Sequence, residues 1–197
     1  MALTTYTAGE VLTAASLNDN LAYAVTVPVS TPSGLVYITG AGFTSSTTIS
    51  MAAGVFTSTY KSYQVVFKIT SGSDCQISVR VNNAGTPRTS GSYYGGSNRI
   101  GSNNTNIMTA SSAATSLNLC ARVNGEGFGL TMTVFDPTDA TTKTPINAVG
   151  VAGNDSNYPA AINAGGIYYT AEANDGLTWI AGAAVTGFYR VYGLSES

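Results

Sequence analysis

From residue 35 onward, stretches of this chain carry hydrophobic residues at every second position, the spacing of a β-strand that buries one face. The clearest examples are 63–69 and 128–134, and 187–194 is a further aromatic-rich strand. Many short strands of this kind, separated by glycine-rich turns, predict an all-β fold. We expect an antiparallel β-sandwich or jelly roll.

Short turn signals separate the predicted strands: NNAG (82–85), NGEG (124–127), DPTD (136–139), GND (153–155) and NDG (174–176). The last signal lies between β-rich flanks and predicts a hairpin within 167–182. Two segments, 84–106 and 139–163, resist strand assignment because they are rich in Gly, Ser, Thr, Asn and Pro. We expect long loops there, and long loops in a compact domain are usually functional or disordered.

The start of the chain has a different period. Residues 7–10, TAGE, fit a helix capping box, and Leu17 and Leu21 then recur at helical spacing. The helix must end before Pro28, because proline cannot continue it. A helix this short is marginal alone, so we expect Leu12, Leu17 and Leu21 to dock on another surface. The predicted domains are a helical arm at 1–29 and a β-sandwich at 30–197.

Composition limits the classes of partner. Only 9% of the 197 residues are charged, against 44% hydrophobic, and the net charge is −2. An ordinary soluble domain has about 25% charged residues, so this surface must be built from Ser, Thr, Asn and Gly. Without a run of Lys or Arg, nucleic-acid binding is disfavoured. The sequence shows no secretory signal and no stretch apolar enough to span a membrane.

Cys75 is in phase with the apolar residues of its predicted strand, whereas Cys120 is out of phase with the apolar residues around it. The two side chains should therefore point in different directions, which disfavours a disulfide. We expect buried or semi-buried free thiols. The chain contains no histidine, which removes the commonest general base and metal ligand. Asp136 and Asp139 could pair as glycosidase carboxylates, but DPTD after a strand is typical of an Asx turn. We therefore expect no enzyme activity, no cofactor and no metal site.

The segment SGSYYGGSNR (90–99) combines Tyr, Ser, Gly and Asn, the residues that dominate antibody paratopes. Tyr93 and Tyr94 could stack on a sugar ring while Asn98 and Arg99 hydrogen-bond its hydroxyls. Alternatively, the tyrosines cover an edge of the sheet or pack on a sister subunit. The single tryptophan, Trp179, follows the NDG turn in a predicted strand and is expected in the core or at an interface.

Several segments together resemble a known family. They are TYTAGEVLTAASLNDNL (5–21), YKSYQVVFKI (60–69) with ISVRVNNAG (77–85), LTMTVFDPTDATTKTP (130–145) and GLTWIAGAAVTGFYRVYGL (176–194). The last three resemble a β-sandwich domain of tailed-bacteriophage tail-fibre and other virion surface proteins. The first resembles a short N-terminal motif of phage structural proteins.

The resemblance implies a virion structural role and assembly into a homotrimer. It also implies other virion proteins, such as capsid or tail proteins, as partners. The chain lacks the long shaft of a tail fibre, so it fits better as a capsid decoration or cement protein, or a short head or tail appendage. The alternative implied by the family is a receptor-binding module that recognises host surface glycan.

Overall fold

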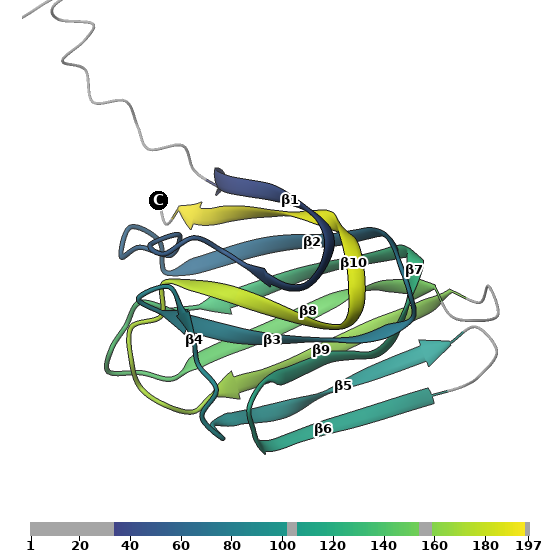
Figure 1. Ribbon diagram of the computed structural model, residues 1–197. Coiled ribbons are helices and arrows are strands. Elements are labelled where there is room, and N and C mark those ends of the chain that lie inside the picture. The colour runs from purple at the N-terminus through teal and green to yellow at the C-terminus, as the bar shows by residue number, and fades with distance from the viewer. Residues whose placement is uncertain (1–33, 102–105, 154–158, 196–197) are drawn as a thin grey trace, which may run out of the picture. The chain divides into compact units, whose positions relative to one another are not determined.

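The computed structural model describes residues 34–101, 106–153 and 159–195, and Figure 1 shows them as a unit of β-strands. These residues contain no helix, so the predicted all-β fold class is confirmed for them. The predicted helical arm, with Leu12, Leu17 and Leu21, lies outside the described residues. The arm and its boundary at residue 29 therefore stay predictions.

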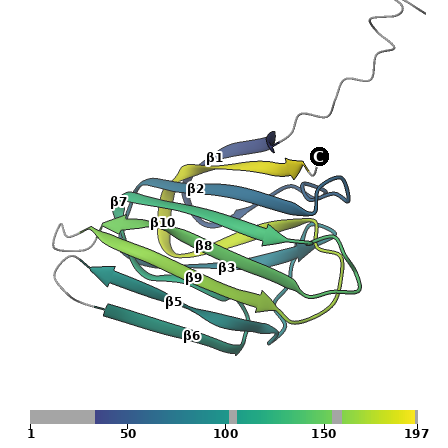
Figure 2. The same ribbon diagram turned by 180° about the vertical axis from the view of Figure 1, so that it is seen from behind.

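The strands form one antiparallel sheet in the order β4-β3-β10-β2-β7-β8-β9-β5-β6, and β1 pairs with the free side of β10. Figure 2 shows β7, β8, β9, β5 and β6 side by side. The bounds are β1 (Gly34–Ser50), β2 (Ser62–Gly72), β3 (Cys75–Asn83), β4 (Thr86–Pro87), β5 (Tyr93–Gly101), β6 (Asn106–Ala114), β7 (Leu117–Phe135), β8 (Thr144–Gly153), β9 (Ala160–Tyr168) and β10 (Gly176–Ser195).

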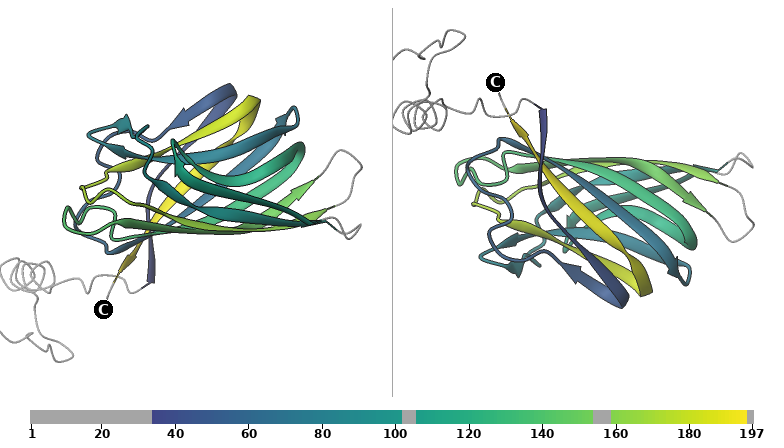
Figure 3. Two further views of the ribbon diagram at one scale, coloured as in Figure 1. Left: turned by 90° about the horizontal axis from the view of Figure 1, so that it is seen from below. Right: turned by 90° about the horizontal axis from the view of Figure 1, so that it is seen from above.

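The two longest strands, β7 and β10, curl the sheet. Residues 176–181 of β10 pair with β3, whereas residues 185–194 pair with β2. Strand β7 divides in the same way, with its first part on β3 and its last part on β2. Strands β2 and β3 therefore each pair with both β7 and β10. Because of this shared pairing, the sheet folds over a single interior, as the views in Figure 3 show.

Aromatic rings from different strands meet in this interior. Phe67 of β2 stacks on Trp179 of β10 with ring centroids 4.7 Å apart, and it meets Phe128 of β7 edge-on at 6.1 Å. All three side chains are buried, as the period-two pattern predicts for Phe67 and Phe128. The prediction that Trp179 lies in the core or at an interface is thus confirmed for the core. Cys75 and Cys120 are also buried, and neither forms a disulfide, as predicted.

The prediction of long loops at 84–106 and 139–163 is wrong. These segments contribute β5, β8 and the starts of β6 and β9, because small residues let neighbouring strands approach closely. A Cβ added to Gly95 would lie 2.3 Å from the carbonyl oxygen of Gly165 on the adjacent strand β9. Glycine here therefore permits strand pairing rather than marking a turn.

Two predicted turns also differ in the structure. NGEG lies inside β7, where the register with β8 shifts between Asn124 and Gly129, so it forms an irregularity within a strand. NDG does not close a hairpin, because β9 pairs with β8 and β5 while β10 pairs with β1, β2 and β3. Instead, the carboxylate of Asp175 accepts hydrogen bonds from the backbone amides of Gly54 and Gly85.

The predicted Asx turn in DPTD is confirmed. The backbone amide of Asp139 donates to the carbonyl oxygen of Asp136 over 3.2 Å. Oδ1 of Asp139 accepts from the amide and the hydroxyl of Thr141, at 2.8 and 2.7 Å. The carboxylate of Asp139 therefore shapes the β7–β8 connection.

Candidate functional site

The four residues predicted to contact a glycan lie on the regular strand β5, so they alternate between its two faces. Tyr93 and Arg99 point to the interior, whereas Tyr94 and Asn98 lie on the outer face. A loop could have presented all four side chains together, but a strand cannot. The structure therefore does not bring them together into one surface.

Tyr93 is fully buried and ties three segments together. Its hydroxyl donates to the carbonyl oxygen of Arg88 and accepts from the amide of Val81, both over 3.0 Å. Burial raises the pKa of this hydroxyl. Since no ring face is exposed, Tyr93 is a structural residue of this chain rather than a platform for a sugar.

Arg99 is 5% exposed, on the inner side of β5. Its Nε and Nη2 atoms are buried and have no hydrogen-bond partner within the described part of the chain. Asn98, on the other face, is half-buried. The Arg99 guanidinium and the Tyr93 ring are therefore not exposed to solvent beside Tyr94.

Tyr94 belongs to an exposed aromatic cluster that the sequence pattern did not reveal. Its ring meets that of Tyr169 edge-on with centroids 5.4 Å apart, and Lys143 Nζ lies 3.0 Å from the Tyr169 ring centroid. Hydrogen bonding and charge from Lys143 lower the pKa of the Tyr169 hydroxyl. Strand β5 supplies Tyr94, and the β7–β8 and β9–β10 connections supply Lys143 and Tyr169, so only the fold brings the cluster together.

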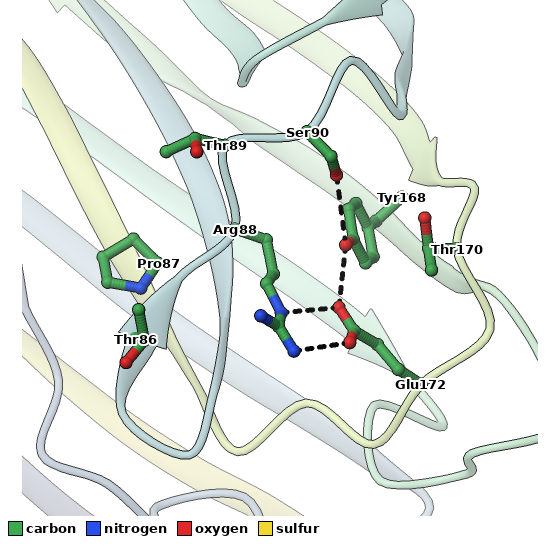
Figure 4. Close-up of a pocket in the computed structure, with 8 residues that line it drawn as sticks. All are labelled: Thr86, Pro87, Arg88, Thr89, Ser90, Tyr168, Thr170 and Glu172. Atoms are coloured by element: carbon green, nitrogen blue, oxygen red, sulfur yellow. Dashed lines mark hydrogen bonds and ion pairs between the residues drawn. The ribbon is translucent and has the colours of Figure 1, made fainter.

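A polar cleft lies at the same end of the sheet. It encloses about 610 Å³ and is lined by 86–90, which run from β4 toward β5, by Tyr168 at the end of β9, and by Thr170 and Glu172 beyond it (Figure 4). Arg88 Nε and Nη2 donate to the two carboxylate oxygens of Glu172 over 2.8 and 2.7 Å. Such a bidentate pair fixes both side chains in one plane.

Further hydrogen bonds hold Glu172 in place. The Tyr168 hydroxyl donates to Oε1 over 2.7 Å, and Asn83 Nδ2 donates to Oε2 over 3.4 Å. The hydrogen bond to Glu172 also raises the pKa of Arg88. Because both carboxylate oxygens already accept two hydrogen bonds each, Glu172 holds Arg88 in place, and the rim adds hydroxyls from threonine and serine. The cleft therefore offers preorganised polar groups to a hydroxyl-rich ligand.

The outer face of β8, β9, β5 and β6, called here the neutral face, is the second candidate. These strands contain one charged residue, Arg99, and it points inward. A groove of about 420 Å³ crosses the neutral face at Asn98, Met108 and Asn163. Large apolar side chains are exposed around it: Tyr94, Ile100, Met108, Val149, Val151 and Ile167.

An exposed apolar face of this extent is typical of a surface that contacts another macromolecule. In the described residues, no group of three or more His, Cys, Asp or Glu side chains is arranged for a metal ion. The same residues include no helix able to traverse a bilayer. Comparisons with family models, with curated proteins and with solved structures gave no match for this chain.

Proposed function

We propose that this chain is a non-enzymatic structural protein displayed on the surface of a tailed-bacteriophage virion. In this role it is a capsid decoration or cement protein, or a short head or tail appendage. The arm at 1–29 docks on the particle, and the curled sheet is the presented β-sandwich. The observation that carries the proposal is the neutral face, because exposed apolar side chains around an uncharged groove suit a protein that works inside an assembly.

Two features of the sequence support this function. The low share of charged residues, 9%, gives little charge repulsion between copies held close together on a particle. The segments that resemble phage virion surface proteins include the arm and most of strands β2, β3 and β10. Three-fold assembly is an implication of that resemblance.

The docking role of the arm is tested by removing residues 1–27. We expect the shortened protein to keep the melting temperature of its sheet and to disappear from purified particles. A finer pair of variants replaces Leu12, Leu17 and Leu21 by Asp, or Asn18 and Asn20 by Asp as the matched control. Only the leucine set should abolish incorporation, since these leucines form the predicted apolar seam. Normal decoration by the leucine variant contradicts the proposal.

A second candidate function is recognition of a host surface glycan, and the polar cleft favours it. The Arg88–Glu172 pair is held rigid by Tyr168 and Asn83 and is surrounded by hydroxyl groups. The guanidinium N–H groups of Arg88 that do not bind Glu172, together with the rim hydroxyls, can hydrogen-bond the neighbouring hydroxyls of a sugar ring. The exposed Tyr94 and Tyr169 lie at the same end of the sheet and supply ring surface.

A glycan array with the wild-type protein tests this second function. Binding should fall for Thr170→Val in the cleft, and for Tyr94→Ala if the aromatic cluster extends the site. Tyr37→Ala, an exposed tyrosine of β1, is the matched control and should bind as the wild type does. An array on which the wild type binds no glycan excludes this function and leaves the structural role unaffected.

A further inference from the structure

Strand β6 is a free edge of the sheet. Among the described residues it pairs with β5 alone, and Figure 1 shows it at the opposite end of the sheet from β1. Its outward side chains are accessible, and Met108 is 75% exposed. A free edge exposes a row of backbone amides and carbonyls that can pair with another strand.

Natural sheets protect long edges with charged residues, proline, bulges or very short strands. Strand β6 is not short, and its nine residues, NIMTASSAA, include no charge and no proline. Its one irregularity against β5 lies near its last residue, where Ala113 has a φ of 48°. Its pairing with β5 runs without a register shift from Gly95 and Ser111 to Ile100 and Asn106. The edge is therefore regular over most of its length.

The other edges of the sheet are protected. Strand β4 is only two residues long. Strand β1 has three register shifts against β10, and Ser45 within it has a φ of 47°. Each irregularity breaks the even spacing of backbone groups that an added strand needs. Among these three edges, β6 alone combines length with regularity.

We propose that β6 pairs with β6 of a second copy of this chain, antiparallel and across a two-fold axis. Strand β6 carries no charged side chain, so pairing it with an identical strand brings no like charges together. Pairing like with like also closes the contact at two copies, whereas pairing β6 with β1 leaves free edges that can propagate. This pairing places the two neutral faces side by side. Met108 and Ala110, which are exposed near the middle of β6, then lie beside the axis.

The size of the contact sets the expected affinity. Nine residues of strand extend about 30 Å, and one strand pair covers far less than the about 800 Å² per partner of a standard interface. We therefore expect a dimer with a Kd in the range of about 1 to 100 µM. Such a contact is negligible in dilute solution and becomes effective when many copies are held close together.

Sedimentation velocity on the full chain, from about 1 to 200 µM, tests the proposal. The wild type should pass from monomer to dimer over this range. Met108→Lys should raise the Kd at least about tenfold, because it loses apolar contact and brings two cations together at the axis. Val149→Lys is the matched control: Val149 is 50% exposed on the same neutral face, but on the interior strand β8, and should leave the Kd unchanged.

Equal weakening by both variants overturns edge pairing and identifies the neutral face itself as the contact. A wild type that stays monomeric, or one whose trimer is indifferent to Met108→Lys, also overturns it. The melting temperature of each variant shows that the sheet is folded, which a substitution at a 75% exposed side chain should preserve.

Hydrogen exchange gives a second measurement that needs no substitution. Peptides covering 106–114 should exchange more slowly at high than at low protein concentration, because the second copy protects the edge amides. Peptides covering 144–153, in the interior strand β8, should exchange at the same rate at both concentrations. Equal exchange of 106–114 at both concentrations contradicts the proposal.

Discussion

The strands β2, β3 and β10 and the strands β5, β6, β8 and β9 use the same pairing rules with different side chains. In the first group, called the aromatic half, large rings fill the interior, with Trp179 between Phe67 and Tyr189. In the second, the small-residue half, alanines such as Ala148 and Ala164 face inward and glycines adjoin across strands. The comparison shows that one half is held by side-chain packing and the other by close backbone approach.

The largest expected effect tests packing in the aromatic half. Trp179→Ala removes a fully buried ring that stacks on Phe67 at 4.7 Å and meets Tyr189 at 5.3 Å. Truncating a buried tryptophan costs about 3–5 kcal/mol, because a cavity remains. Urea unfolding followed by circular dichroism measures this loss. A loss under about 1 kcal/mol would show that the rings are not what holds this half.

The next effect tests backbone approach in the small-residue half. Gly95→Ala places a methyl group 2.3 Å from the Gly165 carbonyl oxygen, so we expect a loss of about 1–3 kcal/mol. Gly165→Ala is the matched control, because the nearest atom to its added methyl group is 3.5 Å away. The control should change the free energy of unfolding by less than about 0.5 kcal/mol. Equal losses would remove the distinction between the halves.

A smaller effect is expected where the two halves meet at the polar cleft. Glu172→Gln weakens the bidentate bond to Arg88 and leaves Tyr168 with a neutral acceptor. Both side chains of the ion pair are partly exposed, so we expect a loss of about 1 kcal/mol. Chemical unfolding at low and high salt checks this, since the loss should shrink as salt screens the pair. A salt-independent loss contradicts an electrostatic cause.

The smallest effect lies in the β7–β8 connection, outside both halves. Hydrogen bonds from Thr141 lower the pKa of Asp139 below its ordinary value of 3.8. A lowered folded-state pKa stabilises the fold above the unfolded value, and that contribution is lost as the pH falls through the folded value. Thr141→Val should raise the pKa of Asp139, which carboxyl NMR titration can follow. An unchanged titration would assign the shift to another group.

The sequence predicted the aromatic half well, because alternation of large apolar and polar residues is visible for stretches such as 63–69. It failed for β5 and β8, because glycine, alanine and asparagine are as common in loops as in closely approaching strands. That error carried over to the candidate site. Residues 93–99 were predicted as a loop, so the inward direction of Tyr93 and Arg99 was invisible.

The polar cleft and the aromatic cluster could not be predicted for a different reason. Arg88 and Glu172 are 84 positions apart, and the ion pair forms only because the connections that follow β4 and β9 meet in the fold. Local pattern carries no information on such a pair. The NDG signal illustrates the same limit, since Asp175 binds the amides of Gly54 and Gly85 instead of closing a hairpin.

The pairing of β1 with β10 has a consequence for synthesis of the chain. Gly34 lies opposite Ser195, so the earliest strand described here is completed by the last one. Their nearer ends, Ser50 and Gly176, are separated by about 125 residues. At about 5–20 residues per second, β1 leaves the ribosome roughly 6–25 s before its partner and stays unpaired meanwhile. Closure of this end of the sheet therefore has to wait until β10 has been synthesised.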